Sequence, residues 1–295
     1  MLKEHLERLV AQQDLAAGVG NDPISIPRRY DDPLDMEIAG VFAATLAYGR
    51  VSLFLPVLGR MFDHADSCGG PRAWVEGVNL AEELPTLEKF SYRFNKGIDH
   101  ALLLGALRAS IERHGSIAGL FEFWWGECGA LKGTLEGAIG ELREGALAAA
   151  LGLGVEAKEF GELPGGIRHA LTSPVSGSAC KRWNLYLRWM VRPESGVDLG
   201  LFRAPPASAL LIPLDVHIHR ISRMVGLTRR ASGGWKTAAE VTAALAAFRP
   251  EDPIHYDFAL SHVGISGGCS GSYAPSPCDE CGLVEHCTVA RAARS

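Results

Sequence analysis

The sequence lacks an uninterrupted apolar run long enough to span a membrane. Its opening segment, MLKEHLERLVAQQ, alternates charges with leucines and has no apolar core like that of a signal peptide. Alternating patterns typical of β-strands are almost absent. The glycines of residues 18–33 do not follow a strand, so they do not predict a phosphate-binding loop. These absences predict an all-helical protein of the cytoplasm.

Positive charge is also scarce for a protein that binds nucleic acid without selectivity. The 295 residues include 29 Lys and Arg against 34 Asp and Glu, a net charge of −5. Residues 181–230, however, hold nine basic and three acidic residues, so their balance is +6 and the rest of the chain carries −11. Such a segment can neutralise a few phosphates; a solvated basic face is the alternative interpretation.

Apolar residues recur at helical spacing through most of the chain, whose length suits two modest domains. Pro56 predicts a break or a new helix start inside the first long segment. Thr237 with Glu240 predicts a capping box, and Asp252 before a proline predicts the start of the last long helix. The predicted helical segments are 36–65, 100–115, 116–127, 130–152, 241–248 and 254–265.

Residues 175–181, VSGSACK, predict a tight turn that leads into a helix. Gly177 can adopt the left-handed conformation without steric cost, and the small Ser178 and Ala179 allow close approach of another backbone segment. A turn of this kind leaves N–H groups without intrahelical partners at the start of the next helix, which favours an anion such as phosphate. Lys181 therefore stands beside a predicted anion site, although a solvated first-turn lysine is the alternative.

The helix predicted after this turn is apolar on most of its surface and has cationic margins. Arg182, Arg188 and Arg192 interrupt its apolar residues, and Pro193 ends it. Basic residues at these positions are candidates for contacts with a phosphate backbone.

A second helix start is predicted at PLDVHIHRI, residues 213–221. Asp215 precedes apolar residues that repeat at helical spacing, so it is placed as the N-cap of that helix. A capping role and nothing more is the alternative interpretation of this carboxylate.

Four of the seven cysteines crowd the C-terminal region, whereas the other three are scattered. Disulfides are not expected without an export signal, and four thiolates from one loop can hold a metal centre. Zinc and an iron–sulfur cluster both accept four cysteines; free thiols are the remaining alternative. The spacing is C-x8-C-x2-C-x5-C, formed by Cys269, Cys278, Cys281 and Cys287.

Taken together, these motifs resemble the helix-hairpin-helix DNA glycosylases. VSGSACK resembles the LPGVGRK-type hairpin of endonuclease III and 8-oxoguanine DNA glycosylase, and PLDVHIHRI resembles the segment that carries their catalytic aspartate. The cysteines resemble the C-x6-C-x2-C-x5-C loop of endonuclease III, with a first gap longer by two residues. Ser176 and Ala179 replace the motif's proline and second glycine, and the 34-residue interval from Lys181 to Asp215 is closest to the archaeal 8-oxoguanine type.

The resemblance implies a two-lobed all-α fold. One lobe would comprise residues 34–205 and end in the hairpin helix; the other would combine residues 1–33 with 206–295. Lys181 and Asp215 would meet across a DNA groove between the lobes. The loop 269–287 would carry a 4Fe-4S cluster in preference to zinc.

The resemblance also implies roles for individual residues. Lys181 would be the amine nucleophile and Asp215 the carboxylate that assists it, while His217 falls where the 8-oxoguanine enzymes keep an active-site histidine. Tyr48 and Arg50 correspond to a turn whose side chain fills the gap left by an extruded base. Further DNA contacts would come from the hairpin and the residue after the lysine, at Gly177, Ser178, Ala179 and Arg182.

The implied activity is that of a base-excision-repair DNA glycosylase with AP-lyase activity. Its partner would be double-stranded DNA containing an oxidised base, 8-oxoguanine first and an oxidised pyrimidine or abasic site second. We expect it to act as a monomer in the cytoplasm, at the nucleoid of a prokaryote. Two other classes stay open, a non-catalytic helical DNA-binding protein and an iron–sulfur redox protein.

Overall fold

The computed structural model describes residues 1–12, 19–193, 197–265 and 268–294. Every regular element in these residues is a helix, and the only strand-like feature among them is an isolated bridge between Tyr92 and Asn95. The predicted all-helical class is confirmed. None of the described helices combines the length and apolar character that a membrane span requires.

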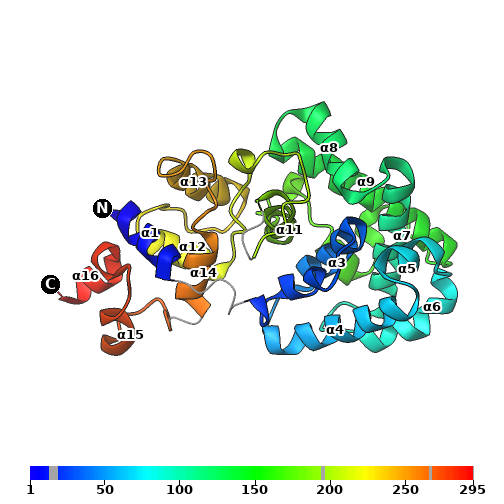
Figure 1. Cartoon of the computed structure of the whole chain (residues 1–295), viewed down its shortest axis with the longest axis horizontal. Helices are drawn as coiled ribbons and strands as arrows, with labels where there is room; N and C mark the ends of the chain where they lie inside the picture. Colours follow the sequence, from blue (N-terminus) through cyan, green and yellow to red (C-terminus); the bar gives the residue numbers. More distant parts are fainter. Residues whose placement is uncertain (13–18, 194–196, 266–267, 295) are drawn as a thin grey trace. The chain divides into compact units, whose positions relative to one another are not determined.

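Figure 1 shows the order of the helices along the chain. The α-helices are α1 (Leu2–Gln12), α3 (Pro33–Leu46), α4 (Val51–Ser67), α5 (Pro71–Gly77), α6 (Leu80–Leu87), α7 (Gly97–His114), α8 (Ile117–Cys128), α9 (Leu131–Gly152), α10 (Gly165–Ala170), α11 (Lys181–Val191), α12 (Val216–Met224), α13 (Trp235–Ala246), α14 (Asp257–Ile265), α15 (Pro275–Asp279) and α16 (Thr288–Arg294). Short 3-10 helices lie at Pro23–Ser25, Pro27–Arg29, Glu88–Phe90, Phe160–Glu162, Pro174–Ser176, Ala207–Ala209 and Val284–His286. Predicted helices over 100–115, 116–127 and 130–152 correspond to α7, α8 and α9.

The chain divides into two compact units whose bounds differ from the predicted lobes. Residues 16–33 belong to the larger unit, and residues 177–188 belong to the smaller one. Lys181 and Asp215 therefore lie in the same unit, not in two different ones. The larger unit comprises Ala16–Ser176 and Trp189–Pro205; the smaller comprises Met1–Leu15, Gly177–Arg188 and Pro206–Ser295.

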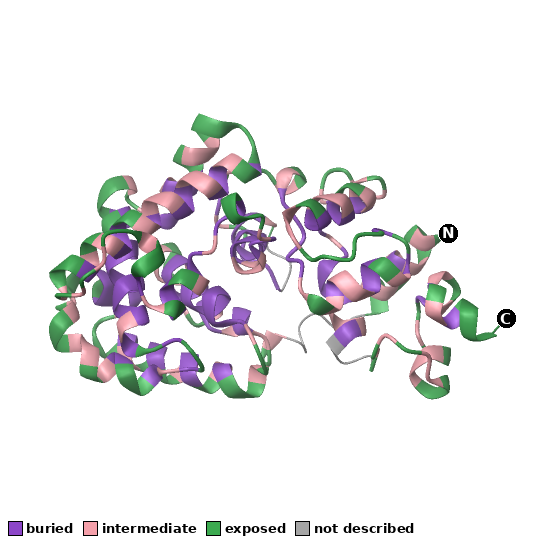
Figure 2. Ribbon diagram, turned by 180° about the vertical axis from the view of Figure 1, so that it is seen from behind, coloured by how far each residue is buried: buried purple, intermediate pink, exposed green. Residues whose placement is uncertain are grey.

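Helix α7 forms the centre of the larger unit. It packs against α6, α8 and α9, and most of its residues are buried (Figure 2). A Cβ atom on Gly105 would lie 2.4 Å from the Cβ of Ala149, and one on Gly145 would lie 3.0 Å from the Cα of Ala106. These glycines let α7 and α9 approach closely, so a larger side chain at either position would force the two helices apart.

The break predicted at Pro56 was wrong, because the chain turns earlier. Helix α3 ends at Leu46, and α4 begins at Val51 and continues through Pro56. The turn is made at Gly49, whose φ of 82° favours glycine and where a Cβ atom would lie 2.5 Å from the hydroxyl oxygen of Tyr92. Pro56 is the sixth residue of α4, so the helix continues past it without the one hydrogen bond that an N–H at this position would donate to the Ser52 carbonyl.

The predicted capping box was also wrong. Helix α13 begins at Trp235, so Thr237 lies inside it and its hydroxyl donates to the carbonyl of Ser232 at 2.5 Å. Glu240 instead accepts hydrogen bonds from Arg230 Nε at 2.6 Å and Thr228 Oγ1 at 2.9 Å. Long-range pairing with the preceding loop has replaced the local cap.

The last long helix begins later than predicted. Its first residue is Asp257, five positions after Asp252. Asp257 is buried and its Oδ2 accepts a hydrogen bond from Arg188 Nη1 at 2.7 Å. The start of α14 is therefore stabilised by an ion pair with α11, which the local sequence did not indicate.

Two buried ionisable groups in the larger unit make opposite contributions to stability. The Glu37 carboxylate accepts hydrogen bonds from the N–H groups of Ile117 and Ala118 at the start of α8, and burial raises its pKa to about 7. His100 is buried beside the carbonyl of Phe90, and burial lowers its pKa to about 4. Folding thus favours protonated Glu37 and neutral His100.

We expect these two contributions to cancel in the wild-type protein. Between pH 5 and 7 the folded state holds the Glu37 proton that the unfolded state releases, so this group lowers the free energy of unfolding as pH rises. His100 does the reverse, because the unfolded state binds its proton up to about pH 6.5. In Glu37→Gln only the His100 effect remains, so stability should rise by about 2 kcal/mol from pH 5 to pH 7. Urea unfolding at several pH values measures this, with exposed Glu127→Gln as control; an unchanged profile in Glu37→Gln would contradict the assignment.

Candidate functional site

The turn before α11 has the predicted left-handed glycine. Gly177 has a φ of 78°, and Cys180, directly before the helix, has a φ of 47°, which is rare for a residue with a side chain. The Gly177 carbonyl accepts a hydrogen bond from the N–H of Trp235 at 2.9 Å. A Cβ atom on Gly234 would lie 2.8 Å from that carbonyl oxygen. The turn is therefore held closely against the first residues of α13.

Ser178 and Ala179 stabilise the turn from within. Ser178 Oγ accepts a hydrogen bond from the N–H of Cys180 at 3.1 Å, and the Ala179 carbonyl accepts one from Asn184 Nδ2 at 2.8 Å. Ala179 is buried, so a contact between its side chain and DNA is excluded in this conformation. Val175, Ser176 and Gly177 are the exposed residues of the turn, and Ser178 is half-buried.

Lys181 is the first residue of α11 and is half-buried, as is Arg182. Farther along the same helix, Arg188 is only 4% exposed because it pairs with Asp257. Arg188 was predicted to lie on a cationic margin of the helix. This prediction was wrong, because its charge is paired with Asp257 inside the smaller unit. Removing one partner of such a buried pair leaves the other charge uncompensated, so Arg188 serves to fix α11 against α14.

Asp215 is the N-cap of α12, as predicted. Its Oδ1 accepts hydrogen bonds from the N–H groups of His217 and Ile218, both at 2.9 Å. Among the described residues, no hydrogen bond or ion pair reaches its Oδ2. One carboxylate oxygen thus orients the side chain on the helix, and the other remains available to a ligand.

His217 lies on the side of α12 that faces α14. A Cβ atom on Gly264 would lie 2.7 Å from the His217 Cβ, so the glycine makes room for the histidine. Arg220 Nη2 donates to His217 Nδ1 at 3.3 Å and to the carbonyl of Cys269 at 2.5 Å. Arginine can only donate, so this contact leaves the proton of a neutral His217 on Nε2. The predicted substrate-binding histidine is thereby connected to the cysteine loop.

The predicted gap-filling residues lie in the larger unit, between α3 and α4. Tyr48 is half-buried, and its hydroxyl is hydrogen-bonded to the Tyr92 carbonyl at 3.1 Å and to Asn95 Oδ1 at 2.6 Å. Its ring stacks on Phe94, with centroids 4.8 Å apart, and Phe94 is 44% exposed. Arg50 is exposed at the start of α4. The aromatic ring exposed at this place is therefore that of Phe94, which the sequence did not single out.

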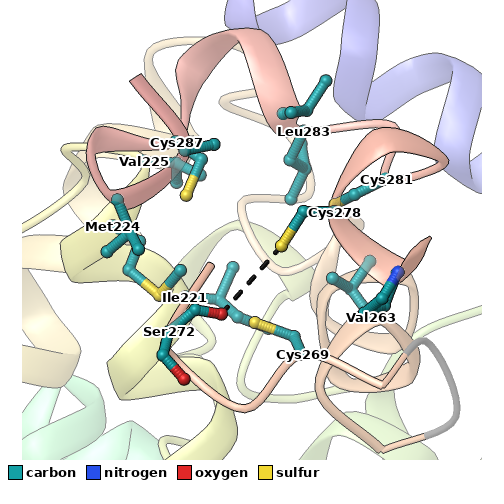
Figure 3. Close-up of a pocket in the computed structure, with 14 residues that line it drawn as sticks. Ile221, Met224, Val225, Val263, Cys269, Ser272, Cys278, Cys281, Leu283 and Cys287 are labelled. Atoms are coloured by element: carbon teal, nitrogen blue, oxygen red, sulfur yellow. Dashed lines mark hydrogen bonds between the residues drawn. The ribbon is translucent and has the colours of Figure 1, made fainter. Parts of the chain in front are cut away.

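The four C-terminal cysteines line one cavity of the smaller unit. Figure 3 shows their side chains around a space whose other walls are largely aliphatic. The N–H of Ala274 donates to the Cys278 sulfur at 3.4 Å. Burial raises the pKa of the Cys281 thiol, and the other three cysteines raise it further. Four thiolates in such a cavity would repel one another unless a cation neutralised them. Its aliphatic walls include Ile221, Val225, Val263 and Leu283.

The spacing of these sulfur atoms bears on the kind of centre. Tetrahedral zinc, with Zn–S bonds of about 2.3 Å, requires sulfur atoms about 3.8 Å apart. Among the described residues, the only three or more ligand atoms that lie within 4.8 Å of one another belong to His5, Glu285 and His286. The four sulfurs are therefore spread more widely than one zinc ion requires.

Comparison with known proteins assigns the chain to one family. A profile of the family described as "Protein of unknown function (DUF2400)" matches residues 22–266, so the chain belongs to this family. The match ends before Cys269, so the cysteine loop lies outside it. No curated protein and no solved structure matches the chain significantly.

Proposed function

We propose that this protein is a base-excision-repair DNA glycosylase with AP-lyase activity that acts on an oxidised base, 8-oxoguanine first, in double-stranded DNA. One observation carries the proposal. Lys181 begins the helix after a left-handed Gly177 turn, and Asp215, with one oxygen used as a cap and the other available, lies in the same compact unit. An amine and an oriented carboxylate are the two groups that Schiff-base excision of a base requires.

The first chemical step is attack by the Lys181 amine. A base inside the duplex is inaccessible, so the damaged nucleotide must first rotate out of the stack. The neutral amine bonds to the anomeric carbon as the glycosidic bond breaks, and the departing base takes the bonding electron pair and gains a proton. Asp215 stabilises the positive charge that develops on the sugar. His217, two residues after Asp215 on the same helix, would contact the extruded base.

The second step cleaves the strand. Loss of the amine proton and opening of the sugar ring give a Schiff base between Lys181 and the sugar. Removal of a proton from the adjacent carbon then expels the 3′ phosphate by β-elimination. Water hydrolyses the Schiff base and restores the lysine. Phe94 and Arg50, both exposed, are the residues proposed to occupy the space that the extruded base leaves.

We further propose that Cys269, Cys278, Cys281 and Cys287 hold a 4Fe-4S cluster. The four cysteines that line one largely aliphatic cavity support a ligated centre, and the resemblance of their spacing to the endonuclease III loop favours a cluster over zinc. The cluster would cross-link the C-terminal loop and supply no chemistry to base removal. A loop with so few buried residues gains most of its stability from ligation of this kind.

Metal analysis tests the cluster. Protein purified without oxygen should be brown and contain about four irons per chain. Cys281→Ser should lower the iron content and the melting temperature together, because the loop loses a ligand. Cys128→Ser, at an exposed cysteine outside the cavity, should change neither. Colourless wild-type protein with one zinc per chain would overturn the assignment.

Incubation with a panel of duplexes, each carrying one lesion, tests the activity. We expect release of the damaged base and a strand nick, strongest with an oxidised purine. Salt-sensitive binding to every duplex without cleavage would instead identify a non-catalytic DNA-binding protein. Iron reduction without any DNA binding would identify a redox protein.

A further inference from the structure

A second cavity of the smaller unit is lined by arginines. It has a volume of about 580 Å³, within the range of small-molecule sites, and lies between α12, the loop that follows it and the start of α16. Arg220, Arg223 and Arg229 all line it, and none of the described residues around it is Asp or Glu. The three arginines belong to the basic segment 181–230, and this arginine cavity gathers them beside a wall formed by Gly271, Thr288 and Val289.

The three arginines differ in how firmly they are held. Arg220 is fixed by its bonds to His217 and to the Cys269 carbonyl. The exposed side chains of Arg223 and Arg229 make no hydrogen bond or ion pair within the described part of the chain. Glu240 pairs with the Arg230 guanidinium and accepts a hydrogen bond from the backbone N–H of Arg229, but it makes no bond to the Arg229 side chain. Three like charges around one hollow favour an anion with several oxygen acceptors, and phosphate has the geometry that guanidinium groups prefer.

The position of the arginine cavity relates it to the candidate site. Val216, the residue after Asp215, lines the cavity and is 74% exposed. On the other side, Gly271 of the cysteine loop lines it, and a Cβ atom there would lie 2.7 Å from Arg220 Cδ. The cavity thus extends from the first residue of α12 to the cysteine loop. A phosphate bound in it would contact α12, the helix that Asp215 caps.

We infer that the arginine cavity binds phosphate groups of a nucleic-acid backbone, with Arg223 and Arg229 as the contacting cations and Arg220 as a fixed wall. A nucleic-acid backbone and a free nucleotide both present phosphate esters, so either could supply the group that the arginines bind. The choice of DNA rests on the proposed function. The size of the cavity suits more than one phosphate, as a backbone provides.

The test compares R223A/R229A with the wild-type protein on an undamaged duplex, so it needs no base release. Each lost phosphate contact lowers the slope of log affinity against log salt by about 0.9, so the double variant should lose about 1.8 of slope and bind about tenfold or more weakly. The control K3A/R8A removes the same charge from exposed positions of α1 and should match wild type. Circular dichroism and thermal unfolding establish that each variant is folded.

The outcomes separate the possibilities. An unchanged affinity and slope in folded R223A/R229A would overturn the inference. The second arm measures the binding of adenosine monophosphate. If this nucleotide binds the wild-type protein but not R223A/R229A, and the two proteins bind the duplex equally well, the ligand is a free nucleotide and the DNA assignment fails. If the slope of log affinity against log salt falls in R223A/R229A but the wild-type protein never releases a base, the phosphate-binding cavity is supported and only the glycosylase proposal is refuted.

Discussion

Lys181→Gln is expected to abolish base release and strand nicking, with a fall in rate on the order of 10³-fold or more, because glutamine cannot form a Schiff base. The variant should remain folded, since Lys181 is a half-buried residue at the start of α11 and such positions contribute little to stability. Single-turnover assays on a lesion duplex measure the rate, and thermal unfolding measures the fold. The matched control is Lys3→Gln, an exposed lysine of α1, which should retain full activity. Strand nicking by Lys181→Gln at the wild-type rate would show that the nucleophile is another residue.

Asp215→Asn should separate activity from stability. Asparagine caps helices about as well as aspartate, so the bonds from the His217 and Ile218 N–H groups can persist and the melting temperature should change little. The negative charge that stabilises the transition state is lost, which should lower the rate of base release by about 10²-fold or more.

Helix α3 provides the comparison for this variant. Asp32 caps it, with Oδ1 accepting from the N–H of Leu34 at 2.8 Å, and no role in catalysis is assigned to it. Asp32→Asn should therefore leave both rate and stability near wild type. A joint loss of rate and melting temperature in Asp215→Asn would instead indicate that Asp215 only caps α12.

Those parts of the candidate site that depend on neighbouring residues were predictable from sequence. The left-handed turn at Gly177 follows from the conformational freedom of glycine, and the cap at Asp215 follows from the hydrogen-bonding reach of a short carboxylate. The long helices of the larger unit were predictable for a similar reason, since their apolar spacing persists over several turns.

Features that depend on distant segments were not predictable in this way. Arg188 resembled a surface cation until Asp257, 69 residues later, was seen to pair with it. The exposed ring of Phe94 stacks on Tyr48, which lies in another part of the chain. The start of α14 and the arginine cavity likewise depend on tertiary partners, which periodicity does not encode.

Trapping of the covalent intermediate tests the central claim most directly. Borohydride added while the protein acts on a duplex with a single oxidised purine should reduce the Schiff base and join protein and DNA irreversibly. Digestion and mass spectrometry should then place the sugar remnant on the peptide that contains Lys181. Absence of any trapped adduct while the lesion is being excised, or a remnant mapped to a different lysine or to the N-terminal amine, would contradict the mechanism.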